Sequence, residues 1–302
     1  MNEINHFLVH KAKNTQNAYM ILIRQVEGFT KKPFIELTTK QAVAFLSSLT
    51  NRAPATLKHR YILLHSIFEF FYDMQMIPFN PIKPAGRIIS WRQAAQVRPT
   101  KMINPLDVVK ILKQPKANTK TGIHDRAMLS LLFGGGFRKS EILALNVGDL
   151  KVNNKNILVV ELRQTKAGKR QLQPIAKFAY PAISELISQR KSDGATENDP
   201  LLVYYYAKTG KVRNRLDVRT LDRRFIKYCR AIGVSAAPHS ARVSYVSQLK
   251  RMGVSDREVA NALRHSGDRM VKVYDKRIIE LEAHPGIELK YFDVTIKKSL
   301  AA

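Results

Sequence analysis

This chain of 302 residues has one cysteine, few acidic side chains and no long apolar run. The single cysteine, Cys229, excludes an internal disulfide and a cysteine-based metal site, and it fits a reducing, cytosolic setting. Because no run of about 18 apolar residues exists, no membrane span is expected. The first residues also lack the apolar stretch of a signal peptide. There is no Gly-x-x-x-x-Gly-Lys-Ser/Thr phosphate loop and no obvious acidic metal cluster, so we expect neither a cofactor nor a metal.

Positive charge is the feature that the chain has in excess. Lysine and arginine total 51 against 24 aspartate and glutamate, which gives a net charge of +27. Such an excess repels itself, so a large polyanion is the expected partner, and nucleic acid is favoured over a membrane surface. The alternative is a basic protein without a specific partner. The length suffices for two domains with hydrophobic cores.

Residues 15–77 predict a helical region. Thr38 and Thr39 are candidate N-caps, and Pro54 introduces the longest helix. In that helix apolar residues recur at spacings of three and four, which is typical of one core-facing side; they are Leu57, Tyr61, Leu64, Phe68 and Phe71. Four basic side chains are candidates for phosphate contacts, although a solvated face explains each of them equally well: Lys31, Lys32, Lys58 and Arg60.

Prolines interrupt this pattern from about residue 80, and periodicity stays weak up to about residue 104. The sequence therefore predicts a helical domain over residues 1–85, a linker over 86–104 and a second domain over 105–302. In the second domain, helices are expected at Leu106–Leu112 and Ile123–Phe133, with three glycines ending the latter.

Arg138 follows these glycines directly, and Glu141 stands three residues further on. A glycine turn before a helix can aim an arginine, and the glutamate can hold its guanidinium by a charge-assisted bond. An ordinary surface ion pair is the alternative. Next, Asn156–Arg163 and Arg170–Ile175 predict a β-hairpin with Lys166 at its tip.

A helix over Val218–Ile232 is basic and amphipathic, and it either lies along DNA or presents a solvated face. Its basic residues are Arg219, Arg223, Arg224, Lys227 and Arg230. Beyond it, His239 and Arg242 stand one helical turn apart, so both can project from one face. His265 follows, and Tyr274 comes nine residues later. A cation, two imidazoles and a phenol together suit an anionic substrate.

In this order the motifs resemble those of the tyrosine recombinases of the phage integrase family. The matching segments, which span about residues 104–280, are Gly136–Glu141, Thr165–Gly168, His239–Arg242, Leu263–Gly267 and Tyr274. The family often has Gly where this chain has Arg264 and His where it has Val243. The resemblance implies a mainly α fold with a small β-sheet. It comprises an N-terminal helical core-binding domain and an α+β catalytic domain of the tyrosine recombinase and type IB topoisomerase type. A start directly at the core-binding helices implies a two-domain recombinase without an extra arm-binding domain.

The resemblance also implies a reaction and its residues. Arg138 and Arg242 would hold the phosphate oxygens and stabilise the charge that develops on them. Tyr274 would be the nucleophile that forms a 3′-phosphotyrosine with a double-stranded DNA site. A phenol has a pKa of about 10 and needs a base, for which His239 is the candidate. The other implied roles are a general acid, a phosphate hydrogen bond and an orienting carboxylate, assigned to Lys166, His265 and Glu141.

Several alternatives stay open at this level. Lys169 competes with Lys166, and Tyr291 is a rival to Tyr274. The family implies a tetramer on two DNA sites with the C-terminal tail docked in a neighbouring copy. Integration, excision and resolution of a mobile element or replicon are all possible tasks. A DNA-binding protein without strand exchange and a type IB topoisomerase-like enzyme are the competing functions.

Overall fold

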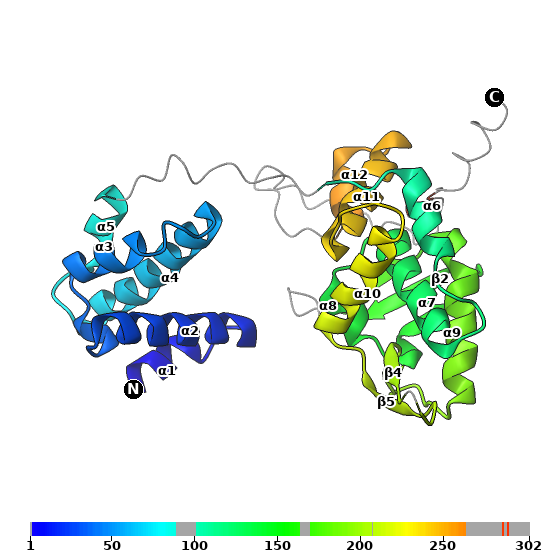
Figure 1. Ribbon diagram of the computed structural model, residues 1–302, viewed down its shortest axis with the longest axis horizontal. Helices are drawn as coiled ribbons and strands as arrows, with labels where there is room; N and C mark the ends of the chain where they lie inside the picture. Colours follow the sequence, from blue (N-terminus) through cyan, green and yellow to red (C-terminus); the bar gives the residue numbers. More distant parts are fainter. Residues whose placement is uncertain are drawn as a thin grey trace. The chain divides into compact units, whose positions relative to one another are not determined.

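The computed structural model describes residues 2–88, 101–163, 170–206 and 208–263, together with residues 286 and 289. This part of the chain is mainly helical and contains two small antiparallel sheets (Figure 1), which confirms the predicted fold class. The chain divides into two compact units, Met1–Pro99 and Thr100–Ala302. Among the described helices, none is long and apolar enough to cross a membrane.

The first unit is built from helices and a short 3-10 turn, Phe34–Glu36. Its helices are α1 (Asn2–Leu8), α2 (Lys13–Thr30), α3 (Thr39–Ser47), α4 (Pro54–Asp73) and α5 (Ile82–Ile88). Thr38 caps α3, because its hydroxyl accepts from the Gln41 backbone N–H while the Gln41 side chain accepts from the Thr38 N–H. Phe68 and Phe71 of α4 belong to the core as the spacing predicts and are at most 1% exposed, and the partly buried Tyr61 packs against this core.

Helix α5 corrects the prediction that regular structure is lost from about residue 80. Ile82 and Ala85 are fully buried in the core of the first unit. Asn80 prepares the helix, since its side-chain oxygen accepts from the Ile82 backbone N–H at 2.9 Å and its amide donates to Glu69 at 2.6 Å. Pro81 thus directly precedes α5 and Pro84 lies in its first turn, where a backbone N–H has no partner within the helix.

In its described residues the second unit combines helices with five short strands. Its helices are α6 (Pro105–Lys113), α7 (Lys120–Gly135), α8 (Lys139–Ala144), α9 (Tyr180–Ser192), α10 (Val218–Arg230), α11 (Pro238–Arg251) and α12 (Asp256–Ala262). The strands are β1 (Leu150–Val152), β2 (Leu158–Leu162), β3 (Gln171–Pro174), β4 (Val203–Tyr205) and β5 (Val212–Arg215). Two 3-10 turns, Val147–Asp149 and Lys177–Ala179, precede β1 and α9.

Helix α7 forms the centre of the second unit and packs against α6, α9 and α11 (Figure 1). Every residue from Ala127 to Gly135 is buried. A helix that is apolar on all sides is stable only when other elements surround it. The three glycines do not stop α7 early: Gly134 and Gly135 are helical, and Gly136 ends the helix in the left-handed conformation with φ of 59°.

The sheets lie at two separate places in the sequence. The predicted hairpin is present as β2 and β3, paired antiparallel from Val159–Pro174 to Leu162–Gln171. Strand β1 extends this sheet on the other side of β2, and the sequence analysis missed it because it is only three residues long. Strands β4 and β5 form the second, two-stranded sheet.

Candidate active site

Arg138 and Glu141 form the first half of the site, at the start of α8. The Arg138 Nη1 donates to Glu141 Oε1 at 2.8 Å, and the Arg138 backbone N–H donates to Glu141 Oε2 at 2.8 Å. The Glu141 side chain is only 8% exposed, whereas that of Arg138 is 38% exposed. One carboxylate therefore holds both the start of the helix and the guanidinium, which is the charge-assisted bond that the sequence indicates.

Helix α11 supplies the second half of the site. Ala237 is its N-cap and Pro238 its first residue, so His239 stands in the first turn. Arg242 stands one turn further on. The His239 side chain is exposed, whereas Arg242 is only 5% exposed.

Backbone carbonyls fix the buried Arg242. Its Nη1 donates to the carbonyl of Gly136, and its Nη2 donates to the carbonyl of Leu263 at 2.7 Å. Gly136 ends α7 two residues before Arg138, and Leu263 is the residue that ends α12. The buried guanidinium thus ties together the turn that presents Arg138, the helix that carries His239, and the end of α12.

A cavity of about 280 Å³ brings these side chains to one place. Arg138, His239 and Arg242 all line it, although about 100 residues separate the first from the other two. The remaining lining residues are Phe137, Lys139, Asp222, Ile226, Ala237 and Pro238. Two guanidiniums and an imidazole around one small cavity make a site for an anion with a titratable group beside it.

Three of the residues assigned to the site by the sequence lie outside the described residues: Lys166, His265 and Tyr274. Their rivals Lys169 and Tyr291 lie outside them as well. Two described residues precede these segments in the sequence. Arg163, at the end of β2, has its Nε 2.5 Å from Asp149 Oδ1, and Leu263 accepts from Arg242.

The candidate DNA contacts divide between the two units. In the first unit Lys31, Lys32 and Lys58 are exposed and Arg60 is half-buried. In the second unit the candidates belong to α10, where the exposed basic residues are Arg219, Arg223, Lys227 and Arg230.

Arg224 does not belong to this exposed face, contrary to the sequence analysis. Its Nη1 donates to Asp125 Oδ1 at 2.7 Å, and the Tyr228 hydroxyl donates to the other oxygen of this buried carboxylate at 2.6 Å. Burial and the hydrogen bond to Asp125 raise the pKa of Tyr228 well above its usual value. These contacts fasten α10 to α7.

Sequence analysis also missed an ion pair at the cavity, between Lys139 of α8 and Asp222 of α10. The lysine Nζ lies 2.9 and 2.8 Å from the two carboxylate oxygens. The signal that could have found it is the single acidic residue in the basic run Val218–Arg230. Its partner stands 83 positions away, so sequence spacing could not identify the pair.

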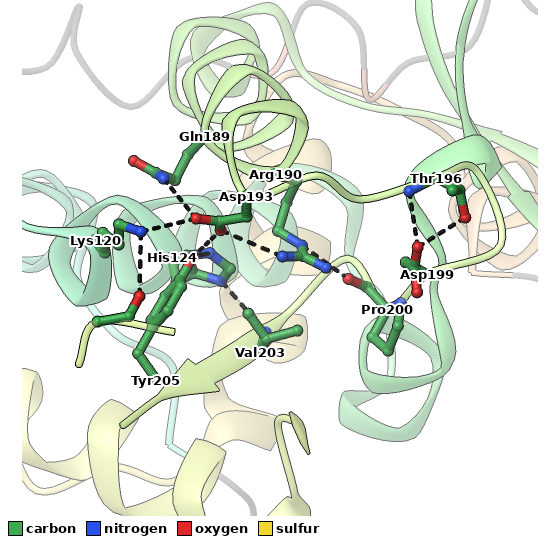
Figure 2. Close-up of polar contacts among 11 residues, drawn as sticks. Lys120, His124, Gln189, Arg190, Asp193, Thr196, Asp199, Pro200, Val203 and Tyr205 are labelled. Carbon is green, nitrogen blue, oxygen red and sulfur yellow. Dashed lines mark hydrogen bonds and ion pairs between the residues drawn. The ribbon is translucent and has the colours of Figure 1, made fainter. Parts of the chain in front are cut away.

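A second polar cluster fastens β4 to α7 and α9 (Figure 2). The Val203 N–H donates to His124 Nδ1, so the neutral ring carries its proton on Nε2, 2.7 Å from the Tyr205 oxygen. The Tyr205 hydroxyl donates to Asp193 at 2.6 Å, and Arg190 also contacts that carboxylate. Burial, together with Arg190 and Arg224, lowers the pKa of His124 to about 3. None of these residues lines the 280 Å³ cavity, so the cluster is structural.

Comparison with protein families identifies the class. Residues 101–278 match the phage integrase family, and residues 3–76 match the N-terminal SAM-like domain of phage integrases. The chain belongs to the phage integrase family. It is therefore a tyrosine recombinase, an enzyme of site-specific DNA recombination that acts through a phosphotyrosine intermediate.

Named relatives agree with this class. The chain is 25% identical over 301 residues to the tyrosine recombinase XerC of Thermodesulfovibrio yellowstonii, covering 94% of this chain and 95% of the relative. It is 27% identical over 220 residues to XerC of Myxococcus xanthus, covering 72% and 70%.

Solved structures share the fold. The Tn1549 transposon integrase in complex with transposon right end DNA has a TM-score of 0.66 at 18% identity, covering 100% of this chain and 98% of that one. A lambda integrase tetramer bound to a Holliday junction has a TM-score of 0.64 at 18% identity, covering 91% and 79%.

Proposed function

We propose that the 280 Å³ cavity binds the DNA phosphate at which the strand is cut. Arg138 and Arg242 hold its non-bridging oxygens, and their fixed charge stabilises the negative charge that grows on these oxygens during attack. The observation that carries the proposal is that both arginines and His239 line this one cavity. Neither arginine has to be ordered when DNA binds, because Glu141 already holds Arg138 and two carbonyls already hold Arg242.

The reaction then needs a nucleophile, a base and an acid. Tyr274 attacks phosphorus through its phenolic oxygen, and His239 accepts the phenolic proton. The bond from phosphorus to the 5′ oxygen breaks, and Lys166 gives that oxygen a proton. The products are a 3′-phosphotyrosine and a free 5′ hydroxyl, and attack by a 5′ hydroxyl of another strand reverses the step. His265 donates a hydrogen bond to the phosphate, and Glu141 acts by orienting Arg138.

The substrate follows from charge and family. We propose that the protein binds a double-stranded recombination site and acts as four copies on two sites, as the lambda integrase tetramer on a Holliday junction supports. The first unit is the core-binding domain and would contact phosphates through Lys31, Lys32, Lys58 and Arg60. Since α5 reaches Ile88, the proposed linker starts after it. The C-terminal tail docks in a neighbouring copy, and the enzyme acts at the nucleoid in the cytoplasm.

The test is to trap the covalent intermediate. Purified protein is incubated with supercoiled DNA carrying the region that flanks its gene, then denatured with SDS, and wild type is compared with Tyr274→Phe. Tyr291→Phe serves as the matched control. We expect an adduct in wild type and in Tyr291→Phe, with and without EDTA, and none in Tyr274→Phe.

Each other outcome redirects the proposal. An adduct that survives Tyr274→Phe but not Tyr291→Phe would move the nucleophile to Tyr291. Tight binding without an adduct on any DNA would favour a DNA-binding protein. Relaxation of plasmids without a specific site would favour a topoisomerase-like enzyme.

A further inference from the structure

An acidic side chain lines a cavity that is otherwise suited to an anion. Among the described residues that line the cavity, Asp222 supplies the only carboxylate, alongside Arg138, His239 and Arg242. A like charge beside a bound phosphate opposes binding, and it does so most strongly where water is partly excluded. The carboxylate therefore works against phosphate binding unless a cation neutralises it.

Lys139 provides that neutralisation in the free protein. Its Nζ contacts both oxygens of Asp222, at 2.9 and 2.8 Å. The pair joins the first residue of α8 to α10, and its side chains are 42% and 32% exposed. Ion pairs that are this accessible to water stabilise a protein little, so Lys139 can change its partner at small cost.

The pair lies where the cavity adjoins the exposed basic face of α10. Ile226, one helical turn after Asp222, also lines the cavity. Arg219 and Arg223, on either side of Asp222 in the helix, are exposed. Arg138, the residue before Lys139, is proposed to hold the phosphate that is cut. Lys139 thus stands next to the proposed phosphate position and contacts the basic helix α10.

We propose that Lys139 is a DNA-binding residue and that Asp222 holds it until DNA arrives. Lys139 donates to Asp222 in the free protein and to the phosphate next to the cleaved one in the complex. Asp222 thus competes with this phosphate for the lysine. The inference rests on the proposed function, because it requires a DNA phosphate in the cavity.

The test measures the salt dependence of DNA binding. When a protein neutralises Z phosphates, the logarithm of its binding constant falls linearly with the logarithm of the salt concentration, with a slope of about −0.9Z. The loss of one phosphate contact therefore changes this slope by about one. All proteins carry Tyr274→Phe to prevent cleavage, and the probe is a fluorescein-labelled duplex from the region that flanks the gene. The decisive comparison is between the Asp222→Asn variant and the double variant that also carries Lys139→Ala. In both proteins the Asp222 carboxylate is absent, so Lys139 has no carboxylate to neutralise.

We expect Lys139→Ala to weaken binding severalfold in this background and to make the slope shallower by about one. Lys139→Arg should restore the slope, which would exclude misfolding as the cause. Asp222→Asn alone should tighten binding, because no carboxylate then competes for Lys139 or opposes the phosphate. The matched control is Lys110→Ala, which removes a lysine that pairs with Asp107 on α6 and does not line the cavity; its slope should stay unchanged.

Two results would overturn the inference. An unchanged slope after Lys139→Ala in the Asp222→Asn background would mean that Lys139 only neutralises the carboxylate. Weaker DNA binding after Asp222→Asn alone would mean that the intact Lys139–Asp222 ion pair supports binding. Because binding is read without cleavage, either result can occur with a normal adduct in the Tyr274 experiment, so the two proposals fail separately.

Discussion

Two arginines of the site are held in different ways. A carboxylate orients Arg138, whereas backbone carbonyls orient the buried Arg242. An arginine bound to a carboxylate shares its charge with that partner, and its open edge remains for a ligand. Loss of Glu141 should therefore change how Arg138 is placed more than how tightly DNA binds.

Glu141→Gln tests this placement. The glutamine oxygen can still accept from the Arg138 backbone N–H, but its NH2 group then faces the guanidinium and cannot accept, so the charge-assisted bond is lost. We expect the rate of adduct formation to fall about tenfold while the Kd for DNA changes less than about threefold. Glu141→Ala should lower the rate further. An equal loss in rate and affinity would mean that Glu141 supports the fold of α8 rather than the position of Arg138.

His124 predicts an acid sensitivity of the second unit. Its pKa is about 3 in the folded protein and about 6.5 in an unfolded chain. Between these values the unfolded chain binds a proton that the folded protein does not, so stability is lost as pH falls below about 6.5. This one group contributes a slope of up to about 1.4 kcal/mol per pH unit.

The measurement is urea unfolding between about pH 7 and 4.5 for wild type and His124→Gln. The variant should be less stable at pH 7, because it disturbs the contacts to Val203 and Tyr205. Its stability should also depend less on pH. Carboxylates such as Asp217, whose pKa is lowered by hydrogen bonds from Thr220, act in both proteins and cancel in the difference. If the free energy of unfolding depends on pH equally in both proteins, the acid sensitivity does not come from His124.

At the scale of elements, one turn joins the two halves of the site. Gly136 ends α7 with φ of 59°, and its carbonyl accepts from Arg242. A Cβ at this position would lie 2.6 Å from a ring carbon of the buried Tyr245 on α11. The turn therefore needs glycine both for its backbone conformation and for the close approach of α11.

Gly136→Ala should destabilise the protein by about 2 kcal/mol or more, since the left-handed conformation and the contact with Tyr245 both become unfavourable. Adduct formation should fall more than stability alone explains, because Arg138 follows two residues later. Thermal unfolding and adduct formation measure the two effects. The control is Gly28→Ala in α2, where a Cβ meets nothing within 4 Å, so stability should be unchanged or slightly raised. Full activity in Gly136→Ala would refute this view of the turn.

At the scale of the whole molecule, charge determines the conditions under which DNA binds. A net charge of +27 predicts that affinity depends mainly on released counterions. We expect the Kd for the duplex to rise at least about a thousandfold between roughly 50 and 200 mM salt. Fluorescence anisotropy measures this. A change of less than about tenfold would show that phosphate contacts supply little of the affinity.

The sequence alone determined much about this protein. The apolar spacing in Pro54–Asp73, the cap at Thr38 and the β2–β3 hairpin are local patterns, and each is present in the structure. The family could also be inferred, because the order and spacing of its motifs survive where overall identity is low. Local signals failed at α5, where prolines that usually interrupt a helix begin one instead, and at β1, which is too short to show an alternating pattern.

Only the tertiary structure decided what surrounds the site. The bonds from Arg242 to Gly136 and Leu263, the bond from Arg224 to Asp125, and the Lys139–Asp222 pair all join residues far apart in the sequence. A sequence records which charges are present, but the partner of each charge depends on which helices meet in the folded chain. For this reason the sequence could indicate Arg138, His239 and Arg242 as candidates, whereas the Asp222 carboxylate that lines the same cavity could not be predicted.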